Sequence, residues 1–112
     1  MPEFQTVMDV APDGAIRLLL LGELDFAAIP SLRDELERVM GAHRVVRIDL
    51  SRLDFIDATG LRTIASAVAD AGRNSRTLTL AQPLAPQVRR VIEFAEAAGS
   101  PWPAPNEGLQ AA

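Results

Sequence analysis

Short apolar runs alternate with amphipathic stripes along this chain, and their order restricts the fold more than any other feature of the sequence. Two strand-like runs, residues 4–10 and 15–21, flank a turn signal at residues 12–14 with the sequence Pro-Asp-Gly. So short a connection predicts an antiparallel hairpin. Apolar residues also alternate with polar ones over 46–50, and residues 77–81 form a fourth strand-like run. These patterns predict four strands.

Three other segments carry apolar residues at helical spacing. Helices are predicted over 28–40, over about 59–72, and from 83–86 onward. Gly41 is predicted to end the first helix, and residues 51–60 are predicted to be a loop that leads into the second. A hairpin followed by alternating helices and strands predicts an α/β fold, with one mixed four-stranded sheet and three main helices.

The chain has the length of one ordinary domain. It has 112 residues, of which 48% are hydrophobic, enough to build a core without disulfides. Three prolines in five residues follow Ser100, so residues 1–99 are predicted to form the domain and 100–112 a loosely ordered tail. Trp102 in that tail either folds back onto the domain or is exposed.

Composition excludes several kinds of chemistry. The chain has no cysteine and one histidine, His43, and all 11 of its basic residues are arginine. Disulfides and thiolate metal sites are therefore excluded, as are P-loop nucleotide hydrolysis and a receiver-type phosphoaspartate site, which need a lysine. We expect no metal, no cofactor and no enzymatic activity. His43 is interpreted as a solvated loop residue.

Charge and hydropathy indicate where the chain acts. The net charge of −4 gives little attraction for nucleic acids or anionic membranes. The longest apolar stretch is far too short to cross a bilayer, and the acidic start of the chain does not resemble a secretory leader. We therefore expect a cytoplasmic protein without membrane insertion that binds no nucleic acid.

The junction between the third strand and the second helix is the most informative place for function. Thr59 is predicted to lie at or next to the N-cap of that helix, where a phosphate would meet free N–H groups and the helix dipole. The same phosphate would bring about −1.5 to −2 charge to a partner surface beside Asp57 and near Asp25. Ordinary helix capping is the alternative explanation for Thr59 and Asp57, and Asp25 could instead cap the first helix or close the turn at Gly22.

Two motifs in this region carry a resemblance to a known family. The first is Gly-Glu-Leu-Asp at residues 22–25, and the second is Leu-Asp-Phe-Ile-Asp-Ala-Thr-Gly-Leu at residues 53–61. Over residues 4–96 the chain resembles the STAS family, and within it the bacterial anti-sigma factor antagonists. The resemblance implies a STAS-like fold and makes Thr59 the phosphorylated residue.

The resemblance also implies a regulatory cycle. The unphosphorylated protein binds an anti-sigma factor that is also an ATP-dependent serine/threonine kinase, and so frees a sigma factor. Phosphorylation releases the complex, and a metal-dependent phosphatase reverses it. The alternative is a STAS subunit of a lipid-transport ATPase complex, or another STAS scaffold, without a phosphorylation cycle.

We expect the partner to contact the loops around Thr59 and the start of the second helix. The residues expected to bind it are Asp25, Asp57, Ala58, Thr59, Gly60 and Arg62. Three departures from the family pattern stand out. Ala58 replaces a frequent hydroxyl residue, Ala28 replaces a frequent serine or threonine, and residues 94–99 lack the usual closing element.

Overall fold

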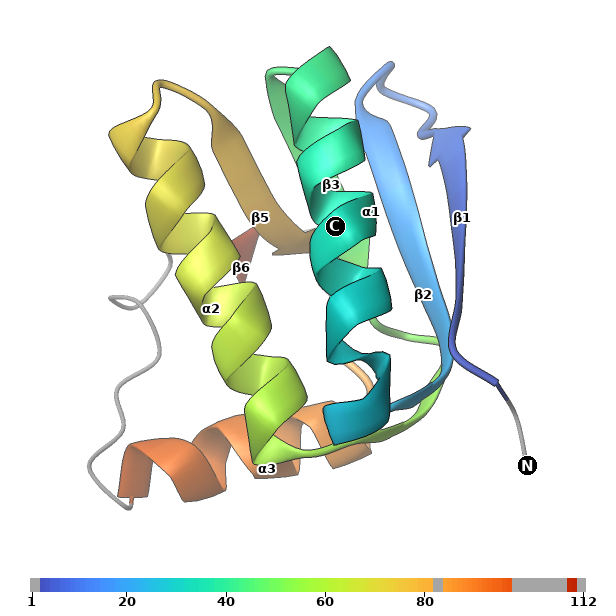
Figure 1. The fold of residues 1–112 in the computed structure, drawn as a ribbon, viewed down its shortest axis with the longest axis vertical. Helices are drawn as coiled ribbons and strands as arrows, with labels where there is room; N and C mark the ends of the chain where they lie inside the picture. Colours follow the sequence, from blue (N-terminus) through green and yellow to red (C-terminus); the bar gives the residue numbers. More distant parts are fainter. Residues whose placement is uncertain (1–2, 82–83, 98–108, 111–112) are drawn as a thin grey trace.

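The computed structural model describes residues 3–81, 84–97 and 109–110. They form a mixed sheet with the strand order β1-β2-β3-β5-β6 and a further strand, β4, that pairs with β2 (Figure 1). The strands are β1 (Gln5–Val10), β2 (Ile16–Leu24), β3 (Val45–Asp49), β4 (Leu53–Ile56), β5 (Thr77–Ala81) and β6 (Leu109–Gln110). β1 and β2 form the antiparallel hairpin that the turn signal predicts, and the other pairs are parallel.

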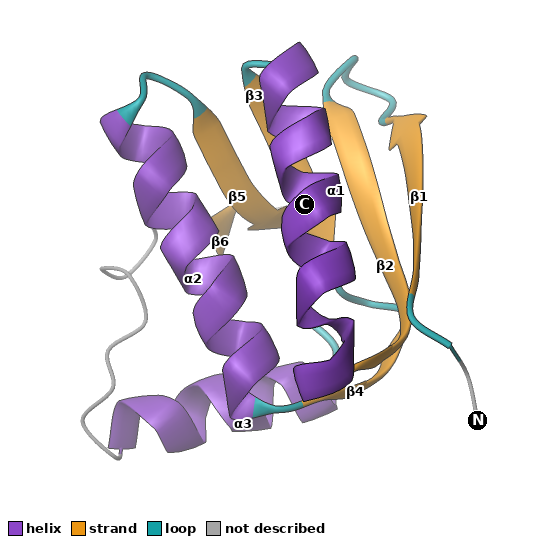
Figure 2. Cartoon of the chain, viewed as in Figure 1, coloured by secondary structure: helices purple, strands orange, loops and turns teal. Residues whose placement is uncertain are grey.

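Two helices cover one face of this sheet. A 3-10 turn, η1 (Phe26–Ala28), leads into α1 (Ile29–Ala42), and α2 (Ala58–Arg73) lies alongside α1 (Figure 2). The third helix, α3 (Pro86–Ala97), contacts β4 and α2 and crosses the end of the molecule at which α2 begins (Figure 1). The right-handed crossovers expected of parallel strands account for α1 and α2 lying on one side.

The core lies between the sheet and this helix layer. Alternate residues of the central strands point into it, because successive side chains of a strand face opposite sides. The apolar stripes predicted from helical spacing meet these residues from α1 and α2. Among the fully buried side chains are Leu18, Leu20, Leu32, Val46, Ile48, Ile64, Leu78 and Leu80.

β2 pairs with two parallel strands, first β3 and then β4, because it bends near its end. Its first half pairs with β3, and residues 22–24 pair with β4 after a shift of register between Gly22 and Glu23. Gly22 has φ = +86°, a left-handed conformation that glycine adopts without steric cost. The bend directs Leu24 and Asp25 toward the start of α2, where the candidate site lies.

The structure confirms the predicted α/β class and corrects several details. Part of the predicted 51–60 loop is the strand β4, which sequence periodicity does not reveal because it has four residues and pairs only beyond the β2 bend. Gly41 does not end α1, which continues to Ala42 with His43 as C-cap. The third helix begins at Pro86.

The predicted tail lies mostly outside the described residues. Leu109–Gln110 form β6, which adds a parallel strand to β5. No strand was predicted there, since two residues carry no periodicity. The predictions for residues 98–108, including Trp102, fall outside the described residues.

A polar contact joins the hairpin to the helix layer and gives a pH-dependent prediction. Glu35 of α1 accepts hydrogen bonds from the Arg38 guanidinium at 2.5 Å and from the Thr6 hydroxyl at 2.7 Å. These bonds, the Arg38 bond foremost, lower the pKa of Glu35 below its ordinary value. A lowered pKa contributes stability that is present above the ordinary carboxyl pKa and is lost as the pH falls through the folded value.

We therefore expect Glu35→Gln to lower the free energy of unfolding at pH 7 by less than about 1 kcal/mol, because Arg38 is largely exposed. The difference should shrink as the pH falls below the ordinary pKa of a glutamate. Urea denaturation at pH 7 and pH 3 measures it. Glu37→Gln, also exposed on α1 and without an ion pair among the described residues, is the control for removing a surface carboxylate from this helix. A constant difference at both pH values would contradict the prediction.

Candidate functional site

Asp57 begins α2 and positions the residues that follow it. It is the N-cap residue, and its carboxylate accepts a hydrogen bond from the Gly60 N–H at 2.8 Å. Its own N–H donates to the Leu24 carbonyl at 3.2 Å, which ties the start of α2 to the end of β2. Asp57 therefore has the capping role that was the alternative explanation for it, and Thr59 is the second residue of the helix rather than its cap.

Gly60 is buried where α2 crosses β2. A Cβ atom at this position would lie 2.8 Å from Leu24 Cγ and 3.0 Å from the Leu24 carbonyl oxygen. The glycine permits this close approach, so the first turn of α2 rests against the end of β2. Gly60 itself offers no side chain to a partner.

Asp25 caps the 3-10 turn that precedes α1. Its carboxylate accepts a hydrogen bond from the Ala27 N–H at 3.1 Å. η1 contacts α2, so the Asp25 loop and the start of α2 lie together, as the sequence analysis predicts. The two aspartates thus stabilise the backbone on either side of the candidate site.

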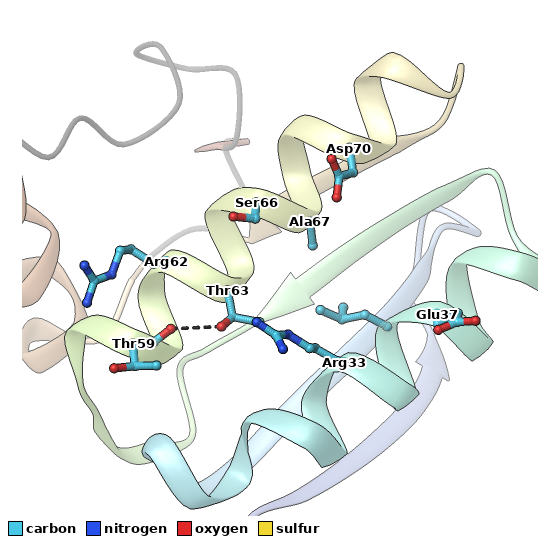
Figure 3. Close-up of a pocket in the computed structure, with 9 residues that line it drawn as sticks. Arg33, Glu37, Thr59, Arg62, Thr63, Ser66, Ala67 and Asp70 are labelled. Atoms are coloured by element: carbon cyan, nitrogen blue, oxygen red, sulfur yellow. Dashed lines mark hydrogen bonds between the residues drawn. The ribbon is translucent and has the colours of Figure 1, made fainter.

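Thr59 lies partly exposed on the first turn of α2, at a groove between α1 and α2. The groove has a volume of about 530 Å³ and is lined by residues of both helices (Figure 3). The Thr59 carbonyl accepts a hydrogen bond from the Thr63 hydroxyl at 2.9 Å. Within the part of the chain that the structure describes, the Thr59 hydroxyl has no hydrogen-bond partner, so it can accept a modifying group without breaking a bond.

Two arginines line the same groove. Arg62 is exposed on α2, as predicted, and Arg33 is exposed on α1. In Figure 3 the Arg33 side chain extends from α1 toward α2. Arg33 was not among the predicted site residues, because only the packing of α1 against α2 brings it to the groove that Thr59 lines.

Exposed aromatic side chains, which were not among the predicted site residues, flank the candidate site. Phe26 in η1 is 78% exposed, and Phe55 in β4 is 46% exposed. η1 contacts α2, and β4 leads directly into it. Exposed aromatic rings are frequent anchors in protein interfaces. Ala58, also exposed, follows Phe55 closely along the chain and adds a small side chain at the first residue of α2.

The described residues hold neither a metal-ligand cluster nor a membrane span. Among the described side chains, those of residues 3–81 and 84–94, no three histidines or carboxylates gather as metal ligands would. No helix among the described residues combines the length and apolar character needed to cross a bilayer.

The mixed sheet, the two helices on one face and the hydroxyl on the first turn of α2 define an α/β domain of the STAS class. A family model described as "Mlab, STAS domain" matches residues 7–99. The chain therefore belongs to this STAS domain family. A comparison with curated proteins found no significant match.

Solved structures with the same fold include anti-sigma factor antagonists. One from Mycobacterium paratuberculosis has a TM-score of 0.70 and 21% identity, covering 95% of this chain and 91% of that one. The antagonist SpoIIAA in its unphosphorylated form has a TM-score of 0.65 and 22% identity, covering 98% and 88%. The phosphorylated form of SpoIIAA, from Bacillus, has a TM-score of 0.62 and 20% identity, covering 96% and 91%. At these identities the likeness establishes the shared fold.

Proposed function

We propose that this protein is an anti-sigma factor antagonist of the cytoplasm. It docks an anti-sigma factor with serine/threonine kinase activity, and phosphorylation of Thr59 by that partner releases the complex. A phosphatase restores the binding form. The observation that carries the proposal is the Thr59 hydroxyl, partly exposed at the start of α2 and without a hydrogen-bond partner among the described residues.

The surroundings of Thr59 support both halves of this cycle. Phe26 and Phe55 offer apolar anchors to a partner, and Asp25, Asp57 and Arg62 offer charges around them. A phosphate on Thr59 adds about −1.5 to −2 charge at a helix N-terminus, which the fold tolerates. A partner docked over this surface meets that charge in a desolvated interface, where it is costly.

Two solved structures of the same fold, described as the unphosphorylated and phosphorylated forms of SpoIIAA, support a modification of this kind. The family description, which names Mlab and a STAS domain but no antagonist, favours keeping a second candidate. That candidate is a constitutive STAS subunit of a lipid-transport ATPase complex. It predicts binding that does not depend on phosphate at Thr59.

Phosphate transfer to Thr59 can be read without ambiguity by mass spectrometry. Trypsin cleaves after Arg52 and Arg62, and Thr59 is the only hydroxyl residue in the peptide 53–62. After incubation with the anti-sigma factor and ATP, we expect one phosphate on this peptide. Thr59→Ala should bind the anti-sigma factor and remain unmodified.

Thr59→Asp should weaken the anti-sigma factor complex at least about tenfold while leaving the melting temperature within the range of ordinary surface variants. Calorimetric titration measures the affinity. Thr77→Asp is the control, since Thr77 is exposed at the start of β5, away from the first turn of α2, and should bind normally. An unmodified peptide, or equal affinity for Thr59→Asp and the unchanged protein, would favour the constitutive subunit.

A further inference from the structure

We infer that Arg33 and Arg62 form an internal receptor for the phosphate on Thr59. The modified side chain would then bridge α1 and α2, and phosphorylation would act by occupying both arginines as well as by adding charge. This inference rests on the proposed function for its biological setting, but its physical content concerns the protein alone.

Arg33 and Arg62 line the same groove as Thr59. Thr59 and Arg62 are three residues apart on α2, a spacing that puts their side chains on neighbouring positions of one helix face. Arg33 enters the same groove from α1. Figure 3 shows Arg33 reaching from α1 toward α2, while the Arg62 side chain extends from the first turns of α2 away from Arg33. Arg62 is exposed, so rotation about its side-chain bonds would bring its guanidinium to a phosphate on Thr59, opposite the guanidinium of Arg33.

The guanidinium groups of Arg33 and Arg62 have no carboxylate partner among the described residues. Among the side chains that the structure describes, the arginines in an ion pair with a carboxylate are Arg17, Arg38, Arg47 and Arg73. In residues 3–81 and 84–94, by contrast, no ion pair or hydrogen bond is made by the guanidinium of Arg33 or Arg62. Both are thus available, and a guanidinium binds phosphate oxygens through two parallel hydrogen bonds.

The acidic groups near the groove leave Arg33 and Arg62 available to bind a phosphate. Asp70, three turns along α2, is engaged by Arg73. Glu37 follows Arg33 by one turn of α1. Asp57 is occupied as the N-cap. The end of the groove at which Thr59 lies therefore combines the hydroxyl that would receive the phosphate with two arginines that have no ion pair.

The receptor gives the modification a second effect on binding. In the unphosphorylated protein, Arg33 and Arg62 are free to pair with carboxylates of a partner. Once phosphate occupies them, those pairs are lost and α1 is fixed to α2. Repulsion alone would leave both arginines exposed and would add no link between the helices.

The experiment uses the full chain with phosphothreonine placed at position 59 by genetic encoding, so it requires neither the kinase nor the partner. The probe is the phosphate itself, followed by phosphorus NMR as a function of pH. Its second pKa is about 6 when unperturbed. We expect a value lower by about half a unit or more, because nearby positive charge favours the dianion. The R33Q/R62Q double variant should bring the phosphate pKa back toward the unperturbed value, leaving only the smaller shift that the α2 dipole causes.

Single variants test the bridge, and thermal unfolding provides a second readout. R33Q and R62Q should each restore part of the shift, while R44Q, at the opposite end of β3 from the α2 start, should restore none. Phosphorylation should raise the melting temperature of the unchanged protein at low salt, with a smaller rise at about 0.5 M salt and a smaller rise in the double variant, where only the helix dipole acts. All three arginines are exposed, so circular dichroism should show an unchanged fold.

Equal phosphate pKa values in the unchanged protein and the R33Q/R62Q variant would overturn the inference. So would a shift that R33Q leaves intact, because the phosphate would then be held by α2 alone. Neither result depends on partner binding. The phosphate pKa could depend on both arginines while the phosphorylated protein still binds its partner. That result would contradict the proposed function and leave the phosphate receptor intact.

Discussion

Replacing Gly22 with alanine is expected to lower the free energy of unfolding by about 3 kcal/mol or more. Two costs add at this position. A residue with a Cβ is strained at φ = +86°, at a cost of about 1–3 kcal/mol. The new Cβ would also lie 2.1 Å from the Glu3 carbonyl oxygen, and overpacking of this kind costs about 1–3 kcal/mol. The obstacle is backbone, so no side-chain rotation relieves it.

Gly14→Ala is the matched control, since Gly14 has φ = +87° but no atom lies within 4 Å of the position that its Cβ would take. It should show the strain alone, about 1–3 kcal/mol. Urea denaturation of the two variants at pH 7 measures the difference. Equal losses would show that the segment at Glu3 moves aside without cost, and would contradict the expected clash.

Replacing Gly60 with valine is expected to cost about 3 kcal/mol and to disturb the candidate site. The Cβ would contact Leu24 at 2.8 Å, and the two valine methyl groups need still more room. Leu24 is fully buried at the end of β2, so neither side can yield easily. The displaced helix start would weaken the Asp57 cap and shift Thr59.

Gly41→Val is the control for helix propensity. Gly41 also lies within a helix, but nothing lies within 4 Å of its Cβ position. Valine is a slightly better helix former than glycine, so this variant should change the free energy of unfolding by less than about 0.5 kcal/mol. Denaturation curves for both variants, with partner binding for Gly60→Val, measure the effect. A loss at Gly60 no larger than at Gly41 would show that α2 can move away from β2.

The two motifs that carry the family resemblance meet at one place in the structure. Gly22 bends β2 so that Leu24 reaches the start of α2. Leu24 accepts a hydrogen bond from Asp57 and packs against Gly60. Most of the motif residues therefore build the support for Thr59. Only Thr59 and its exposed neighbours are available to a partner.

This arrangement explains which parts of the site are readable in the sequence. Thr59, Asp57 and Asp25 lie in local motifs, and helix capping has a local signature, so their neighbourhood could be predicted. Phe26 and Phe55 could not be separated from core residues, because an aromatic side chain in a sequence carries no sign of its exposure. In the sequence, Arg33 cannot be distinguished from any other solvated charge on a helix. Only the structure shows that it lines the same groove as Thr59.

The sequence by itself determined the order of the main helices and strands, the hairpin, and the apolar faces that build the core, because these depend on local periodicity and turn chemistry. Only the tertiary structure decided that β2 bends at Gly22 to pair with β4, that Gly60 rests on Leu24, and that Arg33 lines the same groove as Thr59 and Arg62. The physical reason is that each of these contacts joins segments far apart in the chain. Their geometry is set by how the helices pack on the sheet rather than by any neighbouring residue.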